Sequence, residues 1–290
     1  MGDGIRYAYQ EKSNISLREL KLSIIGVCAG AFSAALGVGG AAIVIPALLF
    51  FCKYRPSTAV GTSLAAIMPA TAVGFLTHLY IAPSHLQFSL AIYTFFWAAA
   101  GTFLGAYVTK KMSSNTLTVL FGILLFLVGI QMLGVVRIPI NPVSPSSFTL
   151  FFAIIGFFAG VSSALFGIGG GAILVPSLIL GAGFTEYEAI ATSLAIIAPT
   201  TAVGFWQHRR LGNVITPDLP WLIPASFVGA VSGAFLANTL PQDVLRISFA
   251  LFIIACALKL FYEQTKSTIR RKVLHTHRKP KEEMATLHIQ

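Results

Sequence analysis

One stretch of the sequence occurs twice, and this duplication restricts the folds that the chain can adopt. Residues 24–78 align with residues 154–208 without a gap at an offset of 130, and roughly half of the positions are identical. A repeat this long is not one unit of a solenoid, so the chain consists of two homologous halves. The recurring positions include Gly26, Gly30, Ser33, Gly37, Gly39, Gly40, Ile43 and Pro46, which return as Gly156, Gly160, Ser163, Gly167, Gly169, Gly170, Ile173 and Pro176.

The composition places both halves in a membrane. The 290 residues are 56% hydrophobic and only 10% charged, whereas soluble proteins average about 25% charged residues. The net charge of +10 does not indicate nucleic acid, because the basic residues gather at the N-terminus, in short loops and in the tail after Lys259, where they determine topology. The sequence predicts an all-α polytopic membrane protein that contacts the lipid bilayer and binds no nucleic acid.

Two membrane topologies are compatible with the apolar segments. The glycine clusters at 37–40 and 167–171 interrupt apolar runs. The arms that follow, residues 41–52 and 172–182, would rise only about 15–18 Å, half of a hydrocarbon core of ~30 Å. Each interrupted run is either one kinked crossing, which gives eight spans, or a re-entrant hairpin, which leaves about six full spans.

The positions of Lys and Arg favour the hairpins, although the kinked model stays open. The hairpin model exposes only Arg137 and Arg246 outside and keeps both termini in the cytoplasm. Three full spans per half then make an inverted-topology repeat, with the glycine clusters meeting near the bilayer midplane. The kinked model would instead place outside Lys53, Arg55, Lys110, Lys111 and Arg246.

The same pattern divides the chain into five parts. Prolines and small polar residues between the halves indicate a stiff, extended connection. The expected parts are a cytoplasmic N-terminal segment (1–20), a first transmembrane repeat (21–136), a linker (137–149), a second transmembrane repeat (150–262) and a basic cytoplasmic tail (263–290).

The glycine clusters are the first candidates for a substrate site. No Asp, Glu, Lys or Arg lies clearly at membrane depth in the apolar spans, so a site there must use dipoles and hydroxyls. Glycines can free backbone N–H groups at a helix N-terminus, which attracts an anion without a basic side chain. Glycines spaced as GxxxG, such as Gly26 and Gly30, are interpreted as packing positions. Those expected to contact a substrate or to shape the hairpin are Gly37, Gly39, Gly40, Gly167, Gly169, Gly170 and Gly171.

Duplicated hydroxyls and prolines on the next span are the second group of candidates. Hydroxyls in membrane helices usually bond to their own backbone, but duplication beside prolines makes four of them candidate substrate ligands: Thr62, Ser63, Thr192 and Ser193. Proline breaks a helix hydrogen bond and exposes carbonyl groups. We expect a path or its gates to be lined by Pro69, Thr71 and His78 and by their equivalents Pro199, Thr201 and His208.

The sequence lacks the groups that catalysis requires. It contains no HExxH motif, no nucleophile beside a base and no carboxylate pair within the spans. The cysteines lie in apolar runs without CxxC spacing. We expect no enzymatic activity, no cofactor and no metal site.

The duplicated pattern resembles the sulfite exporter TauE/SafE family of bacterial inner-membrane permeases. It reads Ala-Gly-x-x-Ser-x-x-x-Gly-[Val/Ile]-Gly-Gly-Gly/Ala-x-Ile-x-x-Pro, followed by Ala-x-x-Thr-Ser-Leu, and the resemblance covers about residues 20–262. It implies secondary transport of small sulfur-containing anions, such as sulfite or organosulfonates, across the cell inner membrane. Ala41 departs from the pattern where the second half has Gly171, so the half-sites need not be symmetric. An anion-selective channel is the alternative, and homo-oligomer formation is left open.

Overall fold

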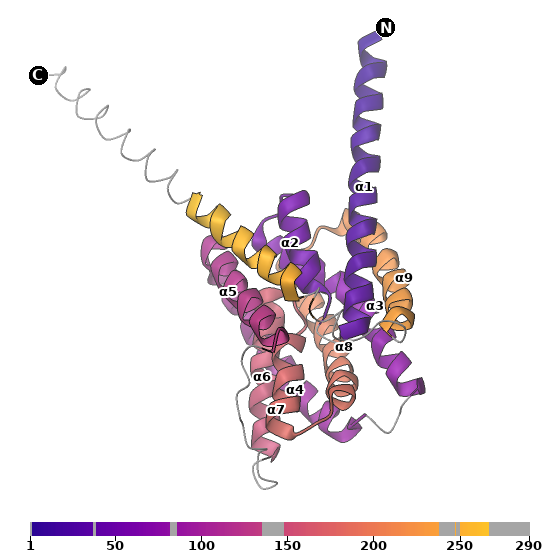
Figure 1. Cartoon of the computed structure of the whole chain (residues 1–290). Helices are drawn as coiled ribbons and strands as arrows, with labels where there is room; N and C mark the ends of the chain where they lie inside the picture. The colour runs from indigo at the N-terminus through magenta and orange to yellow at the C-terminus, as the bar shows by residue number, and fades with distance from the viewer. Residues whose placement is uncertain are drawn as a thin grey trace, which may run out of the picture.

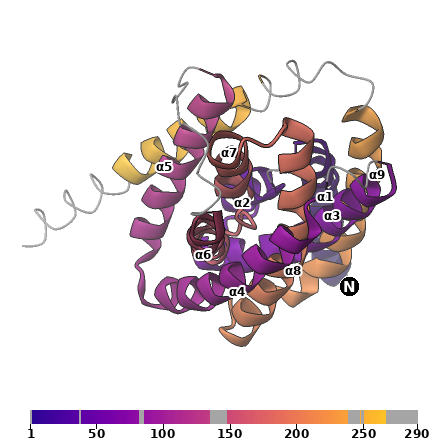
Figure 2. The same ribbon diagram turned by 90° about the horizontal axis from the view of Figure 1, so that it is seen from below.

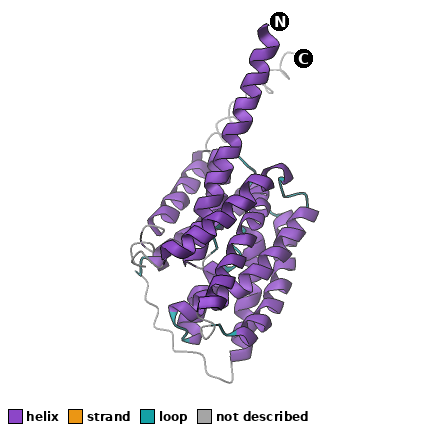
Figure 3. Ribbon diagram, turned by 90° about the vertical axis from the view of Figure 1, so that its right-hand side faces the viewer, coloured by secondary structure: helices purple, strands orange, loops and turns teal. Residues whose placement is uncertain are grey.

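The computed structural model describes residues 2–36, 39–81, 86–134, 148–237, 247 and 250–266, and all regular secondary structure within them is helical (Figures 1 and 3). The first half contains α1 (Gly2–Leu36), α2 (Ala41–Phe51), α3 (Pro56–Ile81), α4 (Phe88–Lys111) and α5 (Ser114–Met132). The second contains α6 (Phe148–Phe166), α7 (Gly171–Ala182), α8 (Glu186–Arg210), the 3-10 helix η3 (Thr216–Asp218), α9 (Leu219–Ala237) and a helix over residues 250–266.

Five of the described helices are long and apolar enough to cross a membrane: Pro56–Tyr80, Phe88–Lys111, Ser114–Gln131, Phe148–Phe166 and Tyr187–Arg210. The sequence led us to expect about six spans, or eight in the kinked model, and the count of five covers the described residues only. The outward faces are apolar, as lipid requires; Phe96 is 66% exposed and Leu127 is 58% exposed. The prediction of an all-α membrane protein is therefore confirmed, and the number of crossings stays a prediction.

Both glycine clusters separate two helices. α1 ends at Leu36 and α2 begins at Ala41, while α6 ends at Phe166 and α7 begins at Gly171. We call residues 39–40, the described part of the first cluster, the first tip and residues 167–170 the second tip. Gly167, Gly169 and Gly170 have positive φ, which glycine adopts without steric cost.

The short helices α2 and α7 run back alongside α1 and α6, the helices that precede them. Arg18 of α1 donates a hydrogen bond to the hydroxyl of Tyr54, just beyond α2 (3.3 Å). In the second half, Gly181 near the end of α7 lies against the ring of Phe151 near the start of α6, and Figure 2 shows α6 and α7 nearly end-on beside each other. The arms therefore run antiparallel in both halves.

Glycine faces bring helices of opposite halves together. In the pair α1–α9, Gly26 lies against the backbone of Leu222 and Gly30 against that of Ser226. In the pair α4–α6, Gly101 lies against the backbone of Phe157 and Gly105 against that of Val161. Residue numbers rise together along both pairs, so each is parallel, and backbones approach closely because glycine has no side chain.

α3 and α8 cross at the centre of the molecule. The added methyl group of an alanine at Gly74 would lie 3.1 Å from Leu194, and one at Gly204 would lie 3.1 Å from Leu64. These two contacts are equivalent under the offset of 130, and their order makes α3 and α8 antiparallel. The central pair of equivalent helices, α3 and α8, thus runs in opposite directions.

The described basic residues gather at one end of the bundle, which we call the basic end. Arg18 lies there beside Tyr54 and forms an ion pair with Asp218 (2.8 Å), while Lys259 lies over the ring of Phe50. The residues at this end also include Lys21, Lys53, Arg55, Lys110, Lys111, Arg209 and Arg210. Arg137 and Arg246 lie outside the described residues.

Some boundaries expected from the sequence are not tested. α1 begins at Gly2 and therefore runs continuously through the expected N-terminal segment (1–20), and Figure 3 shows this part projecting beyond the bundle. Most of the linker (137–149) and of the tail (263–290) lies outside the described residues.

We predict that Gly160→Ala destabilises the protein by about 1–3 kcal/mol, because its methyl group would meet the backbone carbonyl of Ala98 and force α4 and α6 apart. Thermal unfolding in detergent measures this loss. Gly122→Ala is the control, since the nearest atoms there belong to the Phe261 ring (3.0 Å), which can move. Equal unfolding temperatures for the two variants would contradict the close backbone contact.

Candidate functional site

The two tips meet where α3 and α8 cross. Gly39 of the first tip lies against the carbonyl oxygen of Ile168 in the second. The hydroxyl of Ser63 in α3 donates to Val60 O (2.8 Å) and lies 3.4 Å from Gly167 O. A methyl group at Gly169 would lie 3.0 Å from Thr201 in α8. The structure therefore brings together most of the predicted glycines with Ser63 and Thr201, whereas Gly37 lies outside the described residues.

The helices that start at the tips have buried, uncapped N-termini. Neither Gly40, before α2, nor Gly170, before α7, provides a side-chain cap. Ala41 is 0% exposed, and Gly171 is buried as well. The first N–H groups of a helix have no partner within the helix, and they carry partial positive charge. The arrangement offers hydrogen-bond donors for an anion in a region without a described charged side chain.

Thr62 and Thr192 have equivalent structural partners. The hydroxyl oxygen of Thr62 accepts a hydrogen bond from the backbone N–H of Ile215 (3.2 Å), and that of Thr192 accepts one from Gln87 (3.4 Å). Both donors lie in the loops that lead into α9 and α4. The two threonines, which we expected to be substrate ligands, thus fix these loops, and a role in binding stays a prediction.

The other hydroxyls on α3 and α8 bond to their own helices. Ser193 donates to Ile190 O (2.9 Å), Thr71 to Ile67 O (3.0 Å), and Thr201 to Ala198 O (2.9 Å). Pro69 and Pro199 lie inside α3 and α8, which continue through them. The role of these threonines and prolines in lining a substrate path stays a prediction.

The side chain of His208 forms a hydrogen bond with the backbone at the end of α6. Its ring is fully buried, with Nε2 2.9 Å from Ala164 O and Nδ1 3.3 Å from the amide nitrogen of Asn213. A neutral ring that carries its proton on Nε2 satisfies both contacts, because it donates to the carbonyl and accepts from the amide. Thr109 also reaches Ala164 O (3.3 Å). His78, the equivalent residue, lies half-buried near the end of α3.

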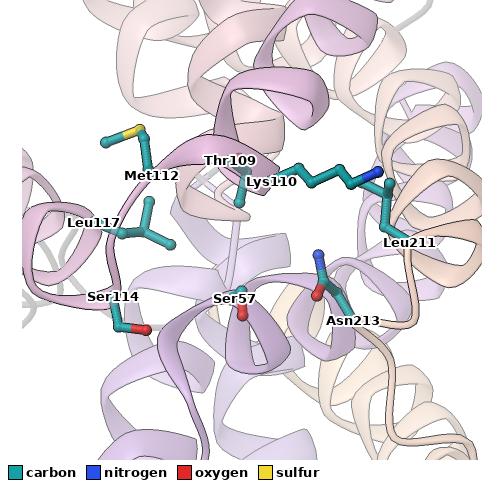
Figure 4. Close-up of a pocket in the computed structure, with 8 residues that line it drawn as sticks. All are labelled: Ser57, Thr109, Lys110, Met112, Ser114, Leu117, Leu211 and Asn213. Atoms are coloured by element: carbon teal, nitrogen blue, oxygen red, sulfur yellow. The ribbon is translucent and has the colours of Figure 1, made fainter.

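A pocket of about 150 Å³ opens at the basic end, between the start of α3 and the ends of α4 and α8 (Figure 4). Asn213 lines it and connects through His208 to Ala164, three residues before Gly167. A hydrogen-bonded chain thus links the pocket to the last turn of α6, which precedes the second tip. The lining residues are Ser57, Thr109, Lys110, Met112, Ser114, Leu117, Leu211 and Asn213.

Four buried polar atoms have no hydrogen-bond partner in the described part of the chain: Ser33 Oγ, Ser162 Oγ, Ser163 Oγ and Gln207 Nε2. Ser33 and Ser163 recur at the offset of 130 but are not among the predicted site residues. Their duplication was the available signal. Among the described residues, no three His, Cys, Asp or Glu side chains come together to hold a metal ion.

Comparison with known proteins gives the family. The model of the family described as "Sulfite exporter TauE/SafE" matches residues 6–132 and 151–287 of this chain. The chain belongs to this family. The two matched ranges contain the two duplicated stretches, residues 24–78 and 154–208, so the resemblance seen in the duplicated pattern is confirmed.

Relatives of this TauE/SafE protein are named as membrane transporters. A probable membrane transporter protein, YunE, of Bacillus subtilis is 28% identical over 83% of this chain and 97% of its own length. One from Xylella fastidiosa is 28% identical over 81% of this chain and 91% of its own length. One from Methanocaldococcus jannaschii is 31% identical over 63% of this chain and 69% of its own length. These names support a transporter of this family and specify no substrate.

We predict that Gly170→Ala destabilises the second tip by about 1–3 kcal/mol, because alanine disfavours positive φ. Gly170 has φ 86°, and the added methyl group would lie 2.7 Å from Ala159 O. Gly171→Ala is the matched control, since Ala41 stands at the equivalent place in the first half. The fraction that stays monodisperse after heating in detergent measures the difference. The same loss in both variants would show that backbone strain at Gly170 is not the cause.

Proposed function

We propose that this protein is a secondary permease for small anions, with sulfite or organosulfonates as its substrates. The observation that carries the proposal is the meeting of two tips, each followed by a buried, uncapped helix N-terminus, at the crossing of α3 and α8. The matched family description names sulfite, and an oxyanion suits a site that offers N–H donors.

The anion would be held without a basic side chain. Arg209 and Arg210 lie at the last turn of α8, and Lys110 lies at the basic-end pocket, so their charges act from the edge of the bundle. Burial strengthens each N–H contact because no water competes for the anion. A site of this kind binds tightly enough to select an anion and lacks the strong ion pair that would slow its release.

We further propose that the halves form an inverted-topology repeat with two re-entrant hairpins. The antiparallel arms α1–α2 and α6–α7 support the hairpins, and the antiparallel crossing of α3 and α8 supports inversion about an axis in the membrane plane. In such repeats a central site opens alternately to each side when the halves rearrange. The tips lie on that axis, where either side can reach them.

The basic end would face the cytoplasm of the inner membrane, together with both termini. Positive residues near membrane spans are retained inside the cell, and the described basic residues from Arg18 to Lys259 gather at this end. Arg210 over Trp206 and Lys111 over Tyr107 are the cation–aromatic pairs expected at a membrane interface. The pocket beside Lys110 would then be the cytoplasmic access to the second tip.

Transport by the purified protein in liposomes tests the function. We expect sulfite uptake that saturates, exceeds that of empty liposomes, and is reduced by isethionate, an organosulfonate. Flux that rises linearly with sulfite and needs no counter-ion gradient would support the anion channel instead. No flux above empty liposomes with either anion would overturn the proposed substrate class.

Thiol labelling tests the orientation. In a background without Cys28, Cys52 and Cys256, we expect Lys111→Cys to react with an impermeant maleimide only in inside-out vesicles. Tyr187→Cys, exposed at the opposite end, should react only in intact cells. Labelling of position 111 in intact cells would contradict a cytoplasmic basic end.

A further inference from the structure

Two buried serines occupy equivalent positions in the halves and lack a partner. Ser33 is 1% exposed and Ser163 is 0% exposed. Neither hydroxyl has a hydrogen-bond partner among the described residues. Burying a hydroxyl without a partner costs free energy, so the recurrence of this cost in both halves calls for an explanation.

Other buried hydroxyls in the helices donate hydrogen bonds to backbone carbonyls of the preceding turn, and Ser33 and Ser163 could do the same. Thr102 donates to Ala98 O (2.7 Å), Thr200 to Ile196 O (2.6 Å) and Ser226 to Ile223 O (2.9 Å). Such bonds to the preceding turn are open to any serine in a helix. Ser33 and Ser163 make no such bond.

Both serines lie on the helix face that meets a tip. Gly40 packs against the backbone of Ala29, four residues before Ser33, and Gly170 packs against Ala159, four residues before Ser163. Residues four apart share one face of a helix. Each serine therefore stands on the face of α1 or α6 that adjoins its own tip and the uncapped start of α2 or α7.

We propose that Ser33 and Ser163 are substrate ligands, each donating a hydrogen bond to an oxyanion that the N–H groups at the start of α2 or α7 also bind. This inference rests on the proposed function and names the side chains of that site. Sulfite and sulfonate groups present only acceptor oxygens, which suit hydroxyl and N–H donors. Ser63 and Ser193 are less suited, because their hydroxyls already donate to backbone carbonyls. Thr62 and Thr192 accept hydrogen bonds from loop N–H groups and so hold those loops.

The second half-site holds one more donor than the first. Ser162, 4% exposed and also without a partner, stands where the first half has Phe32. Ser162 is adjacent to Ser163, three residues after Ala159. The site is therefore richer in hydroxyls on the side of α6.

Binding of sulfite to the detergent-purified full chain tests this assignment. We expect sulfite to raise the unfolding temperature of the wild type. Ser33→Ala and Ser163→Ala should need about three- to tenfold more sulfite for half of the effect, the change typical of one lost hydrogen bond. Ser226→Ala is the matched control, since it removes a fully buried serine hydroxyl that has its own partner; its sulfite affinity should equal that of the wild type.

Stability without sulfite separates binding from a structural role. Removal of an unpartnered buried hydroxyl relieves a cost, so Ser33→Ala and Ser163→Ala should unfold at or above the wild-type temperature, and Ser226→Ala below it. Serine variants that lose affinity and also unfold below Ser226→Ala would assign the serines to the fold and overturn the inference.

The two proposals fail in different ways. If neither sulfite nor isethionate stabilises the wild type, the proposed function fails and this inference fails with it. If the wild type is stabilised and both serine variants bind as tightly as the wild type, only the assignment of the serines is overturned.

Discussion

Ending a helix inside an apolar bundle leaves backbone groups that must find partners, and the rest of this structure depends on how they do so. Hydrocarbon offers no water to bond them. At the end of α6, the carbonyl oxygen of Ala164 accepts hydrogen bonds from the side chains of His208 in α8 and Thr109 in α4. At the start of α7, the cap residue Gly170 has no side chain to offer. The carbonyl end is thus satisfied by other helices, while the N–H end has no side-chain cap, and this is where we propose that the anion binds.

The two halves are interlocked because each supplies the surfaces that the other needs. α1 packs on α9 and α4 packs on α6 through glycine faces that fit only a neighbouring backbone. Thr62 of the first half holds the loop at Ile215 of the second, and Thr192 holds the loop at Gln87 of the first. A half alone would expose these faces and lose both loop anchors, so we infer that neither half is a stable unit by itself.

The sequence predicted the helices well and the partners of polar side chains poorly. The apolar arm at 41–52 became α2 (Ala41–Phe51), because the length and composition of an apolar segment are local properties. The bond from Ile215 to Thr62 joins residues 153 positions apart, and no local pattern selects that loop. Ser33 and Thr62 recur equally in the repeat, and only packing distinguishes the hydroxyl without a partner from the one that has a partner.

The two tips differ in backbone conformation although their sequences nearly match. Gly40 has φ −64°, in the right-handed region, whereas Gly170 has φ 86°, in the left-handed region. Glycine visits both regions at little cost, so either tip can adopt the conformation of the other. In the inverted repeat that we propose, alternating access would exchange the conformations of the two halves and so turn the site to the opposite side. A side chain at either glycine would meet the backbone of Ala29 or Ala159, and the freedom to exchange therefore depends on both positions remaining glycine.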